Sequence, residues 1–524
     1  MRLSPVSRGL VFVLAAVLLV GGVIFVNRIL AGDVFSNGEA RHGIFGMWIW
    51  RDIKAGDWGA FWYDTGRQMV WPFFHSWLLS IFFLIFGVGY TSARLLSLIL
   101  FMASVILAYG VSEQLSRESG WKIGMLASAL MLTSPIMLRF ASENMIEGLG
   151  AFLFLLTAYI YTICQRKKLT LYYVCLAVAM GLLIYTNYIY AYFMLPALIV
   201  ATLSKLGPLY FEAVHLKREG EQAAVPFIWW AYRKMIFLII VLMFSGAWFS
   251  FNFTRKILLF LDVISRSGAG EGLGAWQSLI YYPMVIVDDL SFSPWIGVFL
   301  LAALLLFSMA MRYQGLTKLY VFVWTALILA TLTIPAKTSQ MIYPVIPFIF
   351  IIFSATFFFF LDKMRARGKK LALMLILVIL LPTLVSLPRA YALYFPAAEK
   401  QNMVEVLDYF EENVPGEAQI ATILNLQHLN PEVIQFHFKD WGGRILSEDD
   451  LRNNGVAGNN VYYLTIYLDE GSKYQKEVFV DSVHRWNGWL REKEMSGQIQ
   501  LYSSKRFDRA GITAKIYKNT LSGR

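Results

Sequence analysis

The chain has 524 residues, of which 57% are hydrophobic and only 15% are charged. A soluble protein of this size carries about a quarter charged residues, so the composition excludes an ordinary soluble enzyme and indicates an integral membrane protein. The net charge of +11 does not indicate a nucleic-acid partner. Most basic residues lie in short connectors between apolar segments, where they set membrane orientation.

The first predicted element is a membrane-spanning helix near the N-terminus. Arg2 and Arg8 precede a long apolar run, which ends at Val26 without the small-residue cleavage site of a secretory signal. We therefore expect this helix to be retained. Because basic residues stay on the cytoplasmic side, the two arginines predict a cytoplasmic N-terminus.

The first outward segment runs from about 30 to 90 and mixes many aromatic residues with charges. Trp and Tyr favour the membrane–water interface, so we expect short juxtamembrane helices on the outer leaflet. Phe73–Gly87 is apolar, but a span needs about 20 apolar residues. If it crossed, the basic connectors Arg117–Lys122 and Arg166–Lys168 would lie outside, so we expect it to lie in the interface or to dip in and out of the membrane.

The predicted membrane body covers residues 1–389 and has about eleven transmembrane helices, a count that keeps nearly all basic connectors inside. The windows are 9–29, 93–113, 123–138, 147–165, 169–186, 188–205, 234–251, 294–312, 318–335, 341–361 and 371–389. The C-terminus then lies outside. The predicted localisation is the cytoplasmic (inner) membrane, with a periplasmic or extracellular C-terminal domain.

The tail, residues 390–524, predicts a small soluble α/β domain. Lys400–Asn413 has the periodicity of an amphipathic helix. Four segments have the features of strands, because they alternate apolar and polar residues or are rich in β-branched and aromatic residues. They are Ala418–Leu424, Val461–Leu468, Gln498–Ser503 and Ile512–Tyr517.

Several short motifs mark the outer boundary of the membrane body. They are Asn37-Gly38-Glu39-Ala40, Trp71-Pro72 leading to Ile85-Phe86-Gly87, Ala93-Arg94-Leu95, Ser134-Pro135 followed by Ala141 and Glu147, and Lys337 before Tyr343-Pro344. Glu147 opens an apolar helix, where the helix dipole alone favours an anion. An ionisable group at a membrane boundary usually faces a cavity or a partner, which makes Glu39 and Glu147 candidate site residues.

The order of these motifs resembles the GT-C superfamily of membrane glycosyltransferases, in the branch of protein O-mannosyltransferases and lipid A aminoarabinose transferases. In that branch a carboxylate follows the first span, which Glu39 fits. The family more often has an Asp-Glu pair there, and Gly38 departs from it. Relatives of the aminoarabinose type carry a Lys directly before the proline, where this chain has Trp71.

The resemblance implies transfer of a sugar, hexosyl or pentosyl, from a polyprenyl-phosphate donor to a hydroxyl of a lipid, glycan or protein acceptor, with inversion. It implies Glu39 as the general base and Glu147 as a second carboxylate that orients the acceptor or holds an ion. The candidate ligands of the donor phosphate are Arg94, Arg67, Lys337 and His75. For Arg94, a plain anchor at the interface is an equal alternative.

No His/Cys cluster has zinc spacing, so we predict no metal ligands. Some relatives use a divalent cation and others do not, which leaves the cofactor requirement open. Two further functions compete with the transferase: a transporter or flippase of lipid-linked sugars, and a polysaccharide polymerase or ligase. A transporter would have charged or broken helices near the bilayer midplane, whereas the polar groups here gather at the outer boundary.

Overall fold

The computed structural model describes residues 5–520, apart from 33, 69–70, 116–118, 168, 204–223, 251–257, 259–273, 307–315, 335–336, 396–401, 425, 440–442, 447–459, 470–471, 473–479 and 509. The chain forms two compact units. Unit 1 comprises Met1–Phe25, Trp58–His75 and Leu95–Phe395; unit 2 comprises Val26–Asp57, Ser76–Arg94 and Pro396–Arg524. The domain division predicted at residue 390 stays a prediction.

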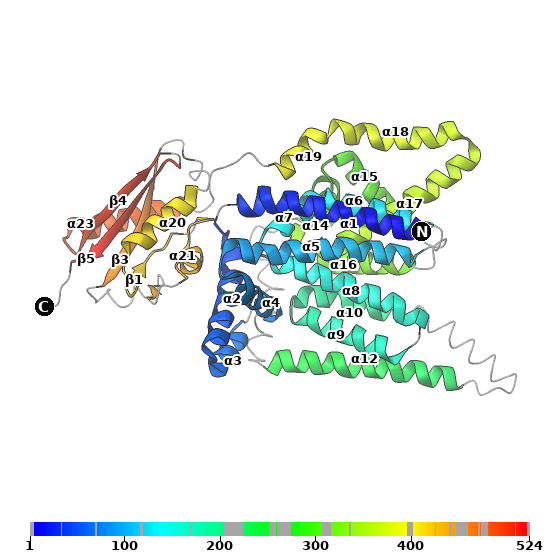
Figure 1. The fold of residues 1–524 in the computed structure, drawn as a ribbon, viewed down its shortest axis with the longest axis horizontal. Coiled ribbons are helices and arrows are strands. Elements are labelled where there is room, and N and C mark those ends of the chain that lie inside the picture. The colour runs from blue at the N-terminus through cyan, green and yellow to red at the C-terminus, as the bar shows by residue number, and fades with distance from the viewer. Residues whose placement is uncertain are drawn as a thin grey trace. The chain divides into compact units, whose positions relative to one another are not determined.

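Unit 1 is helical in all of its described residues that form regular structure (Figure 1). Its helices are α1 (Pro5–Ile24), α3 (Trp58–Gly66), α5 (Tyr90–Glu113, from Leu95 on), α6 (Gly120–Leu132), α7 (Pro135–Ser142), α8 (Ile146–Lys167), α9 (Thr170–Ile184), α10 (Tyr188–Leu203), α12 (Ala224–Ser250), α14 (Ala275–Asp288), α15 (Pro294–Leu305), α16 (Leu316–Thr333), the 3-10 helix η4 (Ser339–Val345), α17 (Ile346–Arg367), α18 (Lys369–Val385) and α19 (Leu387–Tyr394).

Five helices in the described part of the chain are long and apolar enough to cross a membrane, or six if the pair α6 and α7, bent by 65°, is one span. The five are Val6–Leu30, Tyr90–Glu113, Ile146–Cys164, Leu316–Thr333 and Ser339–Arg367. The chain is thus an integral membrane protein. Each of the eleven predicted windows overlaps one or two helices in its described residues, although several helices are short. The ends of windows 188–205, 234–251, 294–312 and 318–335 lie outside the described residues. The count of eleven stays a prediction.

Small residues let the helices of unit 1 approach closely. A Cβ atom at Gly124 of α6 would lie 2.7 Å from the ring of Tyr109 in α5, and one at Gly9 of α1 would lie 2.6 Å from its hydroxyl. That hydroxyl donates a hydrogen bond to the carbonyl of Val6 (2.9 Å). Close backbone approach at small residues is a principal source of helix association in lipid.

Unit 2 begins with the π-helical turn η1 (Phe25–Leu30), α2 (Asn37–Ala55) and most of α4 (Phe74–Phe86). Helix α4 has 13 residues and is too short to cross a bilayer, which agrees with the predicted juxtamembrane element. Helix α2 packs against α21 (Pro431–His437) from the C-terminal part of the unit. Phe436 of α21 contacts the rings of Phe35, Phe83 and Tyr90, at centroid distances of 4.6, 6.2 and 5.4 Å.

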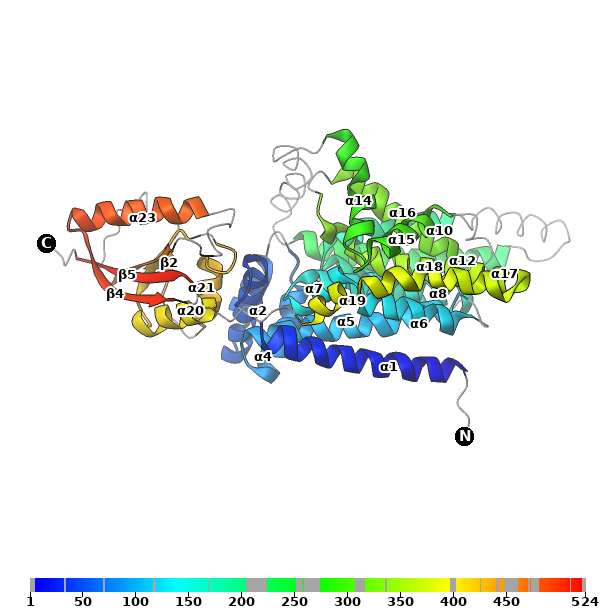
Figure 2. The ribbon, with the colours of Figure 1, turned by 90° about the horizontal axis from the view of Figure 1, so that it is seen from above.

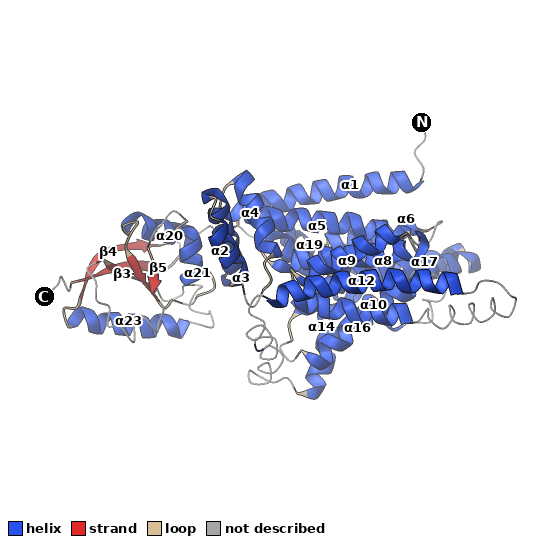
Figure 3. Ribbon diagram, turned by 90° about the horizontal axis from the view of Figure 1, so that it is seen from below, coloured by secondary structure: helices blue, strands red, loops and turns tan. Residues whose placement is uncertain are grey.

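The C-terminal part of unit 2 is an α/β domain with a five-stranded sheet in the order β2-β1-β3-β5-β4. The strands are β1 (Gln419–Ala421), β2 (Ile445–Leu446), β3 (Val461–Leu468), β4 (Ile499–Phe507) and β5 (Ile512–Asn519). Strand β1 pairs in parallel with β2 and β3, and β3, β5 and β4 pair antiparallel. Helices α20 (Asn402–Asn413) and α23 (Val480–Met495) cover opposite faces of the sheet (Figures 2 and 3).

The predicted elements of the tail are confirmed over the described residues. The helix predicted at Lys400–Asn413 overlaps α20. Two of the predicted strand segments contain β1 and β3, and the other two cover the first parts of β4 and β5, which extend to Phe507 and Asn519. Strand β3 is central and buried on both faces from Val461 to Ile466, because α20 and α23 cover the two sides. The elements β2, α21 and α23 were not predicted.

Candidate functional site

Glu39 and Arg94 form a buried ion pair in unit 2. Arg94 Nε donates to Glu39 Oε1 (2.8 Å), and Arg94 Nη2 donates to Glu39 Oε2 (3.0 Å). The side chains are 3% and 7% exposed, respectively. Glu39 is the third residue of α2, and its Oε2 also accepts the backbone N–H of Ser36 (3.0 Å), as in a capping box. The carboxylate therefore holds both the start of α2 and the start of α5.

This geometry bears on the predicted role of Glu39 as the general base. Both of its oxygens accept charge-assisted hydrogen bonds, which are among the stronger bonds in proteins. Taking a proton from an acceptor would disrupt the pair and leave the Arg94 charge buried without a partner. Arg94 also donates to the carbonyl of Val34 (3.3 Å), so both residues are committed to local structure.

Glu147 lies in a different environment, in unit 1. It is the second residue of α8, its exposure is 5%, and its Oε2 has no hydrogen-bond partner among the residues that the structure describes. Tyr190 and Tyr343 lie within electrostatic reach of the carboxylate. A buried carboxylate oxygen without a protein partner is costly, so it is suited to receive a proton or a hydrogen bond from a substrate.

The remaining cationic candidates lie in unit 1, and each has a local role. Lys337 Nζ donates to the carbonyl oxygens of Ala330 (2.8 Å), Thr331 (2.6 Å) and Ile334, and so caps the C-terminal end of α16. Because a lysine ammonium has three donors, these bonds use all of them.

Arg67 and His75 complete the set of predicted site residues. Arg67 forms an ion pair with Asp64 (2.9 Å), and its side chain is 35% exposed. His75, in the first turn of α4, is 1% exposed. Burial lowers the pKa of His75 to about 4, because a buried imidazole disfavours the charged form. At neutral pH it provides a hydrogen bond but no positive charge.

The structure thus brings Glu39 together with Arg94. Glu39 and Arg94 belong to unit 2, and Glu147 belongs to unit 1. Trp71, which replaces the lysine of the aminoarabinose-type relatives, stacks on Tyr188 at a centroid distance of 6.4 Å. An aromatic contact therefore occupies the position at which those relatives have a cation.

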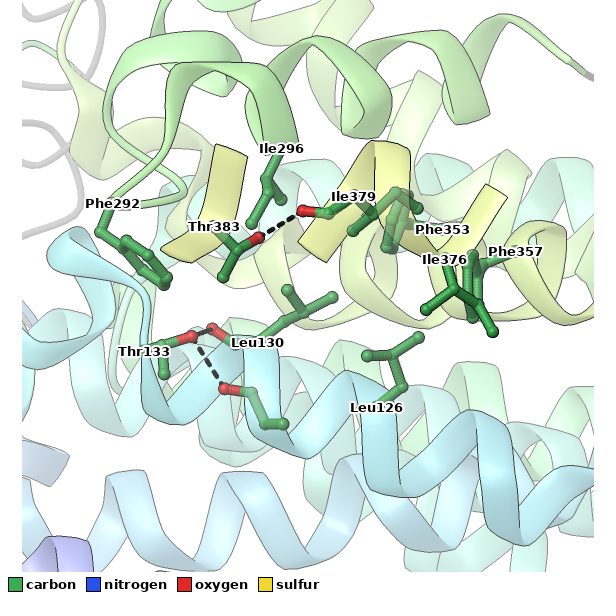
Figure 4. Close-up of a pocket in the computed structure, with 11 residues that line it drawn as sticks. Leu126, Leu130, Thr133, Phe292, Ile296, Phe353, Phe357, Ile376, Ile379 and Thr383 are labelled. Carbon is green, nitrogen blue, oxygen red and sulfur yellow. Dashed lines mark hydrogen bonds between the residues drawn. The ribbon is translucent and has the colours of Figure 1, made fainter. Parts of the chain in front are cut away.

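An apolar cavity of about 420 Å³ in unit 1 was not predicted (Figure 4). Its walls come from α6, α15, α17 and α18, and its lining residues are Leu126, Ala129, Leu130, Thr133, Phe292, Ile296, Phe353, Phe357, Ile376, Ile379 and Thr383. The hydroxyls of Thr133 and Thr383 donate to carbonyls of their own helices, at 2.9 and 2.7 Å. The cavity therefore offers almost purely hydrocarbon contacts, as an alkyl or isoprenoid chain requires.

A second cavity, of about 610 Å³, lies in unit 2 and is more polar. Asn37 and Arg41 of α2 line one side, and Glu432 and Gln435 of α21 line the other. Arg41 pairs with Glu432 across it (3.2 Å). Asn37 Oδ1 is buried and has no hydrogen-bond partner in the described part of the chain. These groups suit a polar, hydroxyl-bearing ligand.

The family model for dolichyl-phosphate-mannose-protein mannosyltransferases matches residues 71–230. Among solved structures, apo ArnT from Cupriavidus metallidurans is similar, with a TM-score of 0.63 and 14% identity over 99% of each chain. The same protein bound to undecaprenyl phosphate gives 0.62 and 15% identity, over 98% of this chain and 99% of that one.

The archaeal oligosaccharyltransferase AglB from Archaeoglobus fulgidus, in complex with an inhibitory peptide and a dolichol-phosphate, has a TM-score of 0.52 and 12% identity, over 98% of this chain and 75% of that chain. The comparison with curated proteins gives no match. At these identities the structural likeness shows a shared fold.

Proposed function

We propose that this chain, a member of the GT-C superfamily of membrane glycosyltransferases, transfers a sugar from a polyprenyl-phosphate donor to a hydroxyl of a lipid, glycan or protein acceptor. The transfer takes place at the outer face of the cytoplasmic membrane. The segment matched by the mannosyltransferase model, residues 71–230, contains Glu147. The observation that carries the proposal is the Glu147 carboxylate, which is buried at the start of a membrane helix with one oxygen lacking a partner among the described residues.

In the proposed reaction, a carboxylate takes the proton of the acceptor hydroxyl. The acceptor oxygen bonds to the anomeric carbon, the bond from that carbon to the phosphate oxygen breaks, and polyprenyl phosphate leaves with the electron pair. A single displacement inverts the anomeric centre. General-base assistance of this kind contributes about 10²–10⁴-fold in rate.

Glu39 and Glu147 are the two carboxylates proposed as catalytic, and the local surroundings of each favour Glu147 as the base. Glu39 is engaged by Arg94 and by the Ser36 amide, so we assign it a positioning role. It fixes Arg94 and the start of α2, from which Asn37 and Arg41 extend into the polar cavity of unit 2.

The donor contributes a hydrocarbon chain and a phosphate. The apolar cavity between α6 and α18 fits the chain. Of the phosphate candidates, Lys337 is engaged in capping α16, and His75 is neutral at pH 7. Arg67 is the candidate with a charged and partly exposed side chain, so it is the proposed phosphate ligand.

The direct test uses full-length protein reconstituted in vesicles with a radiolabelled polyprenyl-phosphate sugar and a panel of hydroxyl acceptors. We expect label to appear in an acceptor, and Glu147→Gln to lower the rate at least about 100-fold. Glu143→Gln is the matched control. Glu143 lies four residues earlier and is already paired with Arg139 (3.0 Å), so transfer should persist within about two-fold.

Two outcomes would replace the proposal. Recovery of intact labelled donor on the opposite leaflet, with no acceptor labelled, would identify a flippase. Label in products of increasing length would identify a polymerase. The proposed orientation, with the N-terminus in the cytoplasm and the C-terminal domain outside, is checked with reporter fusions at both ends.

A further inference from the structure

A compact set of metal-ligand side chains in unit 2 includes none of the carboxylates discussed above. It consists of Asp408 and Glu411 on α20 and His437 at the end of α21. Their potential ligand atoms all lie within 4.8 Å of one another. Asp408 and Glu411 are three residues apart on a helix, which places them on the same face.

The distances match those between ligands of one small cation. His437 Nε2 lies 3.0 Å from Asp408 Oδ1 and 3.6 Å from Glu411 Oε2. Metal–nitrogen and metal–oxygen bonds of about 2.0–2.2 Å, arranged tetrahedrally, separate two ligand atoms by roughly 3.3–3.6 Å. Small side-chain movements would therefore place all three atoms in contact with one ion.

The histidine is held in the orientation that such a site requires. Its side chain is only 9% exposed, and its other ring nitrogen, Nδ1, lies 2.9 Å from the hydroxyl of Tyr90. Metal-bound histidines nearly always use the second nitrogen in this way, which fixes the ring and the tautomer. A hydroxyl can donate or accept, so the Tyr90 bond persists when Nε2 loses its proton to bind a metal.

The carboxylates, by contrast, are open to the solvent. Asp408 is 53% exposed and Glu411 is 44% exposed. An ion can therefore reach the cluster from water and complete its coordination with water molecules.

We propose that Asp408, Glu411 and His437 bind one divalent transition-metal ion, with Zn²⁺ as the reference ion and Tyr90 as the residue that orients the histidine. One imidazole with two carboxylates suits Zn²⁺ and Mn²⁺ better than Ca²⁺ or Mg²⁺. The ion clamps α20 to α21 and so fixes the helix whose Phe436 contacts Phe35 and Tyr90. This role is independent of the proposed sugar transfer.

The test uses purified full-length protein in detergent, stripped with a chelator, dialysed, and then titrated with Zn²⁺ alone. We expect one Zn²⁺ per chain by elemental analysis and a rise in the thermal midpoint, because an ion that binds only the folded state stabilises it. Asp408→Asn and Glu411→Gln should each weaken Zn²⁺ binding at least ten-fold. Tyr90→Phe should weaken Zn²⁺ binding by about ten-fold, the lower end of the range for losing a residue that orients a metal ligand.

Glu412→Gln is the matched control, because Glu412 is exposed on the same helix next to Glu411. It should bind Zn²⁺ as the unmodified protein does. Since Asp408 and Glu411 are exposed, their amide variants are expected to fold, and size-exclusion chromatography checks this. The proposal is overturned if the stripped protein binds no Zn²⁺ on titration, or if the Asp408 and Glu411 variants bind it as tightly as Glu412→Gln. Neither outcome depends on transfer activity.

Discussion

The buried pair of Glu39 and Arg94 allows a prediction whose size follows from its geometry. Glu39→Gln removes the negative charge and keeps the shape of the side chain. The amide oxygen can accept one of the two bonds from Arg94, of 2.8 and 3.0 Å, but the amide nitrogen cannot accept the other. A hydrogen bond to a charged group contributes about 1.5–3 kcal/mol. Breaking a buried pair by removing one partner costs about 3–5 kcal/mol, because a buried charge is left behind.

We therefore expect Glu39→Gln to lower the stability of unit 2 by about 3–5 kcal/mol. The assay is urea unfolding of the purified protein in detergent, followed by tryptophan fluorescence. Glu432→Gln is the matched control, since it makes the same chemical change in the same unit. The Arg41–Glu432 pair is 48% and 32% exposed, and an exposed pair contributes at most about 1 kcal/mol.

A double-mutant cycle with Arg94→Gln makes the prediction sharper. Two neutral amides can hydrogen-bond to each other, so the double variant should be more stable than the sum of the single effects implies, by about 1–3 kcal/mol. If Glu39→Gln destabilises the protein no more than Glu432→Gln, the ion pair does not exist in solution. The carboxylate of Glu39 would then be available as the base, and the assignment of that role to Glu147 would lose its main support.

Three further predictions concern His75, Lys337 and Gly43. The pKa of His75 is lowered to about 4, so the unfolded chain binds a proton below pH 6.5 while the folded chain does not. The contribution of His75 to the free energy of unfolding should thus be complete above pH 6.5 and fall by about 1.4 kcal/mol per pH unit towards pH 4. Urea titrations of His75→Gln should lack this pH dependence. Lys337→Met should lower the thermal midpoint by removing the cap of α16 without changing the KM for the donor; a ten-fold higher KM with an unchanged midpoint would instead identify a phosphate ligand. Gly43→Ala should cost about 1–3 kcal/mol, because its Cβ would lie 2.8–2.9 Å from the rings of Phe35 and Phe436, whereas Gly22→Ala in α1, with nothing within 4 Å, should be tolerated in the same unfolding assay.

Elements with a strong local pattern could be predicted from the sequence, and elements without one could not. Strand β3, Val461–Leu468, consists of apolar, β-branched and aromatic residues, which is a local signal. Strand β2 has two residues and α21 has seven, too few for a period to be visible. Helix α23 did carry a signal, since Val483, Trp486 and Leu490 recur at helical spacing and are buried.

Some features of the candidate site can be predicted from residue type, whereas others depend on which residues are in contact. Residue type and position relative to the predicted spans identified Glu39, Glu147 and Arg94 as ionisable groups at a membrane boundary. The pairing of Glu39 with Arg94 joins residues 55 positions apart, and that of Tyr90 with His437 joins residues 347 apart. No local pattern in one sequence encodes such contacts, since they depend on how the helices pack.

The departure at Gly38 has a physical consequence for the mechanism. Members of the family branch that this chain resembles more often carry an Asp-Glu pair after the first span. In this chain a glycine takes one of these positions, and the acid that remains, Glu39, is held by Arg94 and the Ser36 amide. A carboxylate that secures two helix starts cannot change its protonation in every catalytic cycle without releasing them. In the proposed reaction another carboxylate then takes the proton, and we propose Glu147, which is buried and has one oxygen without a hydrogen-bond partner among the described residues.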